Sequence, residues 1–383
     1  MENHFKNDSQ ESSHEEEEEA QKLNRCMQAL ETEAPAVEQP ESDPTEPCET
    51  FSWTVPIQVT VSMGTPQPAS GGVVDNTPNQ MAGVEGSSSP SRPASESGDF
   101  KIGSVSPNRF SWQTALSTAL ASKLAYETES SIVRTTVDKW GFSKCRSIDV
   151  DDTQCFLAES SAFVLLSFRG TENLGDWLAN LNVWSTARGY GKVHRGFLRA
   201  FQVVGSELES LLNDLNGRPL LLTGHSLGGA LATIAAAEWQ GKIPISGVYT
   251  FGQPGVGKGG FPSFINDNYD GKFYRFVNDD DIVPRVPPTY RHVGKLFHFD
   301  SRGNLKGGSS KLAEAAGVEH GQPEVDMLSE SEFDRLRSEL HARNALAKGA
   351  TIEMPSTPLV EGLLPSVSDH SMDGYIEKVK RMI

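Results

Sequence analysis

The sequence predicts an α/β domain, with a mostly parallel central sheet flanked by helices on both faces. Beyond about residue 108, segments with the helix period alternate at short spacing with apolar runs of strand length. Alternation of this kind is typical of parallel strands joined by helical crossovers, which cover both faces of the sheet. The predicted helices are 112–126, 197–215 and 227–239, and the predicted strands are 154–159, 162–168, 219–223, 245–251 and 272–277.

Each element follows from a local pattern. In 112–126, apolar residues recur at the spacing of one helix face, and in 197–215 the same spacing ends at Asn216-Gly217, a helix stop signal. Segments 154–159 and 162–168 read as two paired strands around Ser160-Ser161. The pattern loosens after residue 299, where a charged helix at 330–347 indicates a peripheral insertion at about 300–364. A last helix is predicted at 371–382.

The first 107 residues differ from the rest in composition. Residues 1–50 hold 15 Asp and Glu against 3 Lys and Arg, and the chain then becomes rich in Gly, Ser and Pro. Neither part can bury enough apolar surface to offset the cost of ordering the backbone. We therefore expect a disordered N-terminal arm at 1–107, with one short strand at 51–61, and a folded domain at 108–383. The acidic run 15–19 serves as a solvated tail or as a docking arm.

Charge and composition exclude several classes. The net charge of the chain is 34 − 51 = −17, and residues 1–50, with 3 bases and 15 acids, contribute −12 of it. This acidic balance argues against a nucleic-acid partner. An acidic chain is also not expected to be drawn to an anionic membrane by charge. No run approaches the roughly 18 apolar residues of a membrane span. The N-terminus has no basic region followed by an apolar one, which predicts a cytoplasmic protein and leaves unconventional secretion open.

Metal, disulfide and nucleotide sites are not expected. Cys145 and Cys155 read as two free thiols, although they could face each other across a hairpin. Cys, His and acidic residues show no zinc or calcium spacing. Residues 255–260 formally satisfy the glycine pattern of a dinucleotide site, but too many elements precede them. No cofactor is therefore predicted, and no protein partner is indicated.

Ser226 is the strongest candidate for chemistry. It lies in Gly224-His225-Ser226-Leu227-Gly228, between an apolar run and a helix rich in Ala. A serine on a sharp strand-to-helix turn needs small neighbours because its strained backbone leaves no room for Cβ atoms. The turn also places the hydroxyl beside a helix N-terminus, whose free N–H groups favour an oxyanion.

A nucleophilic serine needs a base and an acid that orients the base. Asp279, Asp280 and Asp281 follow a predicted strand, where open α/β sheets place their sites, and one of them is expected to turn inward. His370 lies in a loop that opens the last helix, from where it could reach the same edge. Sequence position alone leaves the choice among the downstream histidines open; these are His292, His298, His320, His341 and His370.

Five motifs together resemble those of the class 3 lipases, which are fungal-lipase-like α/β-hydrolases. The motif around Ser226 is accompanied, in the family's order, by Ser-Phe-Arg-Gly-Thr at 167–171, Val-His-Arg-Gly-Phe at 193–197, Thr-Phe-Gly-Gln-Pro at 250–254 and Asp-Ile-Val-Pro-Arg-Val-Pro-Pro at 281–288. The resemblance covers about residues 110–383 and not the N-terminal arm. It implies the α/β-hydrolase fold and hydrolysis of carboxylic esters without a cofactor.

The resemblance also implies roles. Ser226 is similar to the nucleophile, Asp281 to the orienting acid and His370 to the general base, while His292 matches a segment that is not catalytic. Thr171, through its N–H and hydroxyl, and Leu227, through its N–H, are similar to the oxyanion donors. The chain departs from the pattern in the long interval of 370 − 281 = 89 residues between acid and base.

The segment 173–181 occupies the position of the family's lid. Trp177, Leu178 and Leu181 could cover an acyl groove and touch a lipid interface, but a fixed surface helix is an equally good interpretation. His225 is a further candidate for substrate contact.

The sequence thus predicts a serine hydrolase acting on lipid esters, most simply acylglycerols. A soluble carboxylesterase or a phospholipase with the same triad is the alternative, and a non-catalytic lipid-binding protein is a third hypothesis.

Overall fold

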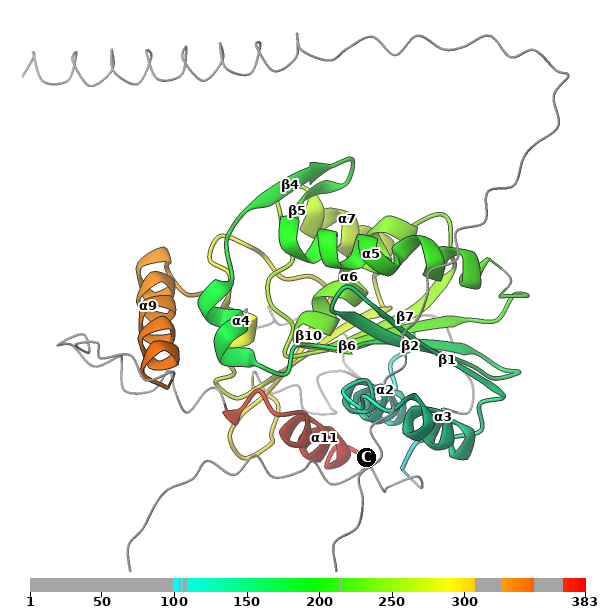
Figure 1. The fold of residues 1–383 in the computed structure, drawn as a ribbon. Coiled ribbons are helices and arrows are strands. Elements are labelled where there is room, and N and C mark those ends of the chain that lie inside the picture. The colour runs from blue at the N-terminus through cyan, green and yellow to red at the C-terminus, as the bar shows by residue number, and fades with distance from the viewer. Residues whose placement is uncertain (1–98, 103–104, 106–108, 214, 307–324, 348–367) are drawn as a thin grey trace, which may run out of the picture. The chain divides into compact units, whose positions relative to one another are not determined.

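A seven-stranded sheet in the order β1-β2-β3-β6-β7-β9-β10 forms the centre of the folded unit (Figure 1). The computed structural model describes residues 99–383 except 103–104, 106–108, 214, 307–324 and 348–367. From β3 to β10 all neighbouring strands are parallel, and β1 and β2 add an antiparallel edge. The predicted fold class is therefore confirmed. The strands are β1 Lys144–Val150, β2 Thr153–Glu159, β3 Val164–Phe168, β6 Leu220–His225, β7 Ile245–Phe251, β9 Phe273–Asn278 and β10 Lys295–Phe299.

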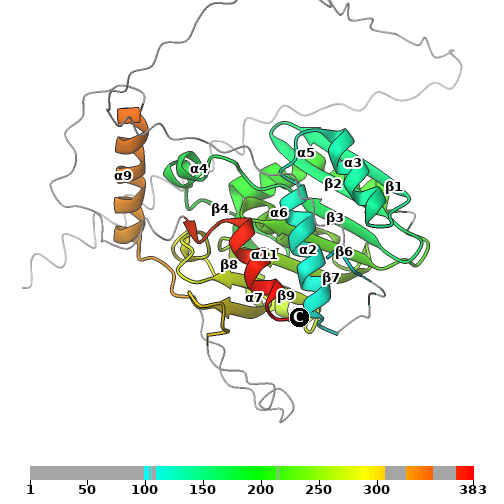
Figure 2. The same cartoon turned by 90° about the horizontal axis from the view of Figure 1, so that it is seen from below.

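Helices cover both faces of the sheet because its central strands are apolar on both sides. Every residue of β3, β6 and β9 is buried. One face packs on α5 Arg195–Leu212, α6 Leu227–Trp239 and α7 Phe261–Asn268. The other packs on α2 Trp112–Leu124, α3 Ser130–Lys139 and α11 Met372–Lys380, of which α2 and α11 lie side by side (Figure 2).

A second, three-stranded antiparallel sheet was not predicted. It consists of β4 Ser185–Arg188, β5 Gly191–His194 and β8 Gly257–Lys258. Its strands are too short, and too rich in Gly, to show a strand period. The glycine-rich segment 255–260 therefore forms β8 and the turn into α7.

The described residues nearest the N-terminus already pack against the folded domain. Phe100 is buried and stacks on Trp140 with ring centroids 4.2 Å apart. The sequence analysis placed Phe100 in the N-terminal arm because the segment that contains it is rich in Gly, Ser and Pro and shows no helix or strand period. Residues 1–98 of that arm, including the strand expected at 51–61, lie outside the described residues. Of the expected insertion, α9 Glu330–Ala347 is described, and its bounds match the prediction.

The two described cysteines are free thiols, as predicted. Across the β1–β2 pair, Cys145 lies opposite Ala158 and Cys155 opposite Ile148, so the register separates the two sulfurs. Burial raises the pKa of the Cys145 thiol to about 11 and that of Cys155 to about 12, which keeps both protonated.

Candidate active site

A sharp turn from β6 to α6 carries Ser226. Its backbone angles, a φ of 58° and a ψ of −129°, lie outside the regions that residues other than glycine usually adopt. The residue is only 1% exposed. A Cβ added at Gly224 would lie 2.3 Å from the carbonyl oxygen of Gly228, and one at Gly228 would lie 2.2 Å from that of Phe168. Backbone atoms fill the space where side chains would stand, so the turn requires glycine on both sides of the serine.

The segment after β3 lies directly against this turn. A Cβ added at Gly170 would lie 2.6 Å from the carbonyl oxygen of His225 and 3.1 Å from Cβ of Ser226. Thr171 follows at once, and Leu227 opens α6, where unpaired N–H groups give the helix its positive end. The two residues predicted as oxyanion donors thus flank Ser226 from two different elements.

Asp281 and His370 meet at the same edge of the sheet. Nδ1 of His370 lies 2.8 Å from Oδ2 and 3.0 Å from Oδ1 of Asp281, with the two residues 6% and 1% exposed. Gly252, with a φ of 56°, makes room for them: an added Cβ would lie 2.8 Å from Cε1 of His370. The backbone N–H of Ser226 donates to the carbonyl of Phe251, the residue before this glycine. The three predicted catalytic residues are therefore brought together around 251–252.

The hydrogen bonds leave one nitrogen and one oxygen ready for proton transfer. Because Nδ1–H of His370 donates to the carboxylate, Nε2 of the neutral ring carries the lone pair. Within the described part of the chain, neither this Nε2 nor Oγ of Ser226 has a hydrogen-bond partner, and both atoms are buried. Such an arrangement can deprotonate the serine once a substrate orders the two groups.

Tyr375, on the last helix, holds the carboxylate of Asp281 and was not predicted. Its hydroxyl donates to Oδ2 at 2.6 Å, while the N–H of Val283 donates to Oδ1 at 2.9 Å. Burial, together with the charge of Asp281, raises the pKa of Tyr375 far above its ordinary value, so the hydroxyl stays a donor. A tyrosine in a helix carries no sequence signal for such a role.

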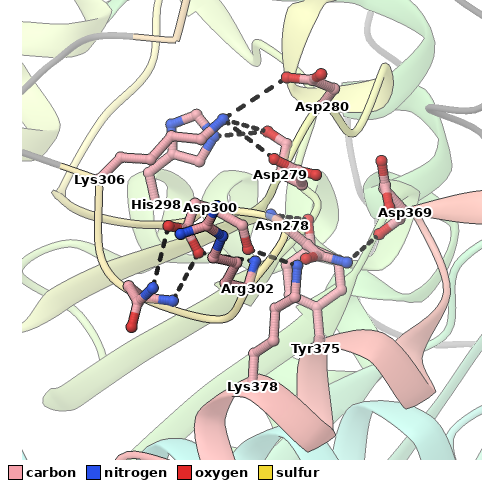
Figure 3. A network of polar contacts seen from close by, with 11 residues as sticks. Asn278, Asp279, Asp280, His298, Asp300, Arg302, Lys306, Asp369, Tyr375 and Lys378 are labelled. Carbon is pink, nitrogen blue, oxygen red and sulfur yellow. Dashed lines mark hydrogen bonds and ion pairs between the residues drawn. The ribbon is translucent and has the colours of Figure 1, made fainter.

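Asn278 joins the acid's loop to the base's loop (Figure 3). Its backbone N–H donates to the hydroxyl of Tyr375, and its Nδ2 donates to the carbonyl of Asp369, the residue before His370. On the other side, Nε2 of His298 and Nζ of Lys306 donate to the carbonyl of Asp279, whose φ is 46°. The loop of the acid is thus fixed on both sides.

Asp369, the residue before His370, lies close to other carboxylates. Burial, followed by the charges of Asp279 and Asp281, raises the pKa of Asp369.

His225 supports the base from behind. Its Nε2 donates to the carbonyl of His370 at 2.8 Å, so its Nδ1 accepts from the hydroxyl of Tyr126, also at 2.8 Å. Burial, and then the nearby His370, lowers the pKa of His225 well below its ordinary value, which keeps the ring neutral. Both nitrogens of His225 are engaged within the protein, one of them by the backbone of His370, and contact of His225 with substrate stays a prediction.

The histidines that were weighed against His370 lie elsewhere. Nε2 of His292 donates to the carbonyl of Pro284, and burial lowers the pKa of His292 well below its ordinary value. His298 donates to Asp279, as described above, and His341 is exposed on α9. His320 lies outside the described residues.

The predicted lid segment forms α4 Leu174–Asn180, which packs inward in this structure. Leu178 and Leu181 are buried, and Trp177 stacks on Phe197 with ring centroids 6.3 Å apart. This arrangement is the one expected of a fixed helix. Whether the helix also moves as a lid stays a prediction.

The insertion helix α9 packs against α4 from outside (Figure 1). Nδ2 of Asn344 donates to Oδ1 of Asp176 at 2.5 Å, and Nε of Arg337 donates to the carbonyl of Ala179 at 3.2 Å. Apolar residues of α9 enter the same core as α4; they are Phe333, Leu336 and Leu340. The charged helix therefore has a buried face, formed where its few apolar residues gather.

Within the described residues, no group of three or more His, Cys, Asp or Glu is arranged to hold a metal ion. The same part of the chain contains no helix long and apolar enough to cross a membrane.

Residues 165–291 match the family described as lipase (class 3). The match includes Ser226 and Asp281 and ends before His370. This segment is therefore similar to the class 3 lipases, and the resemblance predicted from the motifs is confirmed.

Curated relatives include a secreted mono- and diacylglycerol lipase of Fusarium solani, 35% identical over 36% of this chain and 44% of that protein. A triacylglycerol lipase of Arabidopsis thaliana is 30% identical over 48% of each chain, and a lipase of Rhizomucor miehei is 32% identical over 38% and 45%. The chain therefore spans less than half the length of these relatives. Among solved structures, a triacylglyceride lipase of Rhizomucor miehei matches with a TM-score of 0.42 at 24% identity, covering 54% of this chain and 89% of that one.

Replacing Gly228 with Ala should destabilise the domain. The new Cβ would meet the carbonyl of Phe168 at 2.2 Å, and backbone on both sides must shift, at a cost of roughly 1–3 kcal/mol. Urea unfolding measures this loss. Gly189→Ala is the matched control, because a Cβ there meets nothing within 4 Å. Equal stability of the two variants would contradict the packing described for the turn.

Acid should unfold the domain partly through His225. The folded state keeps the ring neutral, whereas the unfolded chain binds a proton below a pH of about 6.5, so stability falls as the pH drops below that value. The slope attributable to this residue is up to about 1.4 kcal/mol per pH unit. Urea unfolding between pH 7 and pH 5 should show a shallower slope for His225→Gln. His341→Gln, on exposed α9, should keep the original slope, and an unchanged slope in His225→Gln would refute the assignment.

Proposed function

We propose that this chain is a serine hydrolase that cleaves carboxylic ester bonds of lipids, with acylglycerols as the main substrate class. One observation carries the proposal: Ser226 lies on a strained turn at a helix N-terminus, beside a buried His370–Asp281 pair whose Nε2 is free to accept a proton. No buried metal-ligand set among the described residues competes with this chemistry.

The proposed reaction uses four parts of the site. Nε2 of His370 takes the proton of Ser226 as Oγ attacks the acyl carbonyl, and Asp281 stabilises the imidazolium. Thr171 and Leu227 hold the oxyanion of the tetrahedral intermediate. His370 then gives its proton to the leaving alcohol. Water attacks the acyl-enzyme with the same histidine as base, which restores Ser226.

The relatives support the choice of lipid esters. Two curated relatives are named as lipases of mono-, di- or triacylglycerols, and the match to the lipase (class 3) family includes Ser226 and Asp281. Because the chain covers less than half of each, their substrates enter as a proposal for this chain.

Phospholipid hydrolysis is the second candidate, favoured by one relative. A phospholipase A(1) of Arabidopsis thaliana is 33% identical over 32% of this chain and 33% of that protein. The same triad would serve this reaction, and the difference would lie in the room for a head group.

Location and lid action remain predictions. The cytoplasmic location inferred from the sequence contrasts with two relatives whose names describe secreted lipases. Contact of α4 with a lipid interface would require the buried Leu178 and Leu181 to turn outward.

Ser226→Ala should lower the hydrolysis of p-nitrophenyl esters by at least about 10³-fold, because the covalent route is lost. The full series from acetate to palmitate should be measured with both proteins. A rate that rises with chain length supports the lipase, and a short-chain preference supports a soluble esterase. Ser210→Ala, on the exposed face of α5, is the control and should match the wild type. No activity in the wild type would contradict the proposal.

Replacing Thr171 tests the oxyanion site. Thr171→Val keeps the shape and the backbone N–H but removes the hydroxyl, so kcat should fall by about 10²–10³-fold if the hydroxyl donates to the oxyanion. Thr171→Ser restores the hydroxyl and should recover most of the rate. If valine and threonine give equal kcat values, the backbone N–H alone acts as the donor.

A further inference from the structure

Two adjacent apolar side chains stand exposed between α4 and β4. Val183 is 40% exposed and Trp184 is 60% exposed, the highest value for any described large apolar residue before the chain's last one. Burying such a pair against a partner would remove apolar surface from water, and an exposed Trp is typical of contact surfaces.

The backbone under this pair is rigidly held. Three consecutive carbonyls accept hydrogen bonds: Asn182 from Nε2 of His194 at 2.8 Å, Val183 from the hydroxyl of Tyr290 at 3.1 Å, and Trp184 from the N–H of Arg195 at 2.9 Å. His194 and Tyr290 are both buried. Since the main chain cannot fold the pair inward without breaking these bonds, the structure presents Val183 and Trp184 to the outside.

One basic side chain contacts the pair, and two further bases lie on the neighbouring strands. The guanidinium of Arg195 lies 4.9 Å from the ring of Trp184. Lys192 and Lys258 lie directly opposite each other across β5 and β8, where like charges repel. The ammonium of Lys258 lies 4.9 Å from the ring of Tyr290, whose hydroxyl binds the carbonyl of Val183. Within the described part of the chain, none of these three bases forms an ion pair with a carboxylate.

The local charge is opposite to that of the whole chain. From residue 177 to residue 206 there is no Asp or Glu, while four Arg or Lys occur. The net charge of −17 had argued against attraction to an anionic membrane, but residues 1–50, with 3 bases and 15 acids, contribute 3 − 15 = −12 of it. A charged surface acts on groups within about 10 Å, so the local patch decides the interaction.

We propose that Val183, Trp184, Lys192, Arg195 and Lys258, the docking patch, attach the protein to an anionic phospholipid surface. The proposal rests on the proposed function, because a lipid-ester hydrolase must reach its substrate at such a surface. Trp184 enters the interfacial layer, and the three bases bind lipid phosphates and carboxylates. The patch follows directly after α4, so attachment brings the α4 end of the candidate site to the lipid.

Vesicle sedimentation tests the patch independently of catalysis. The full chain carrying Ser226→Ala is mixed with phosphatidylcholine vesicles containing 30% phosphatidylserine, or with phosphatidylcholine alone. We expect binding to the anionic vesicles that weakens with salt. Trp184→Ser should weaken it about tenfold, and K192Q/R195Q/K258Q should weaken it roughly a hundredfold, at about fivefold for each charge.

Matched changes elsewhere control for charge and apolar area. K139Q/K144Q/R146Q removes three exposed bases from α3 and β1, and Val150→Ser removes an exposed valine; both should bind as the parent does. Equal binding of the patch variants and the parent, or equal binding to both vesicle types, would overturn the proposal. Hydrolysis of a dissolved short ester is measured separately, with proteins that retain Ser226. A lack of hydrolysis would refute the proposed function but would leave the docking proposal standing.

Discussion

The contact between Gly228 and the carbonyl of Phe168 is the constraint on which the candidate site depends. It lets α6 start directly above the end of β3, and in the parallel pairing Phe168 lies beside Gly224. This backbone contact therefore fixes the positions of two segments: the strained turn that places Ser226 at the helix N-terminus, and the segment that carries Thr171. A nucleophile and its oxyanion donors require this common frame, because a displacement of one against the other removes the electrostatic stabilisation.

The acid and the base depend on a different set of contacts. Asp281 and His370 are 89 residues apart in sequence, so chain connectivity does little to fix their separation. Asn278 and Tyr375 hold the two residues together, since the side chain of Asn278 binds the loop of His370 and the hydroxyl of Tyr375 binds Asp281. The interval between Asp281 and His370 can then vary in length, and here it includes α9, which packs on α4.

The elements that sequence could predict are those whose burial imposes a period. Helix α6 and strand β7 were predicted to the residue, and both are almost wholly buried. Strand β1 was missed because only one of its seven residues is buried, and β8 because two residues show no period. In the site, Ser226 was predicted from its local motif, and Asp281 and His370 were selected by the family resemblance. The contacts of Tyr375, Asn278 and His225 exist only in the tertiary structure. No local pattern distinguishes such residues from ordinary core ones.

The proposed docking patch differs in sign from the net charge for a related reason. The net charge sums over the whole chain, whereas a surface interacts with the few groups that the fold brings within a screening length of it. Here the register of β5 and β8 places Lys192 opposite Lys258, and the cap of α5 places Arg195 against Trp184. The chain runs without interruption from Thr171 through α4 to this patch, and three pinned carbonyls make its end stiff. A stiff connection gives docking a defined orientation, which an enzyme acting on an insoluble substrate needs as much as it needs affinity.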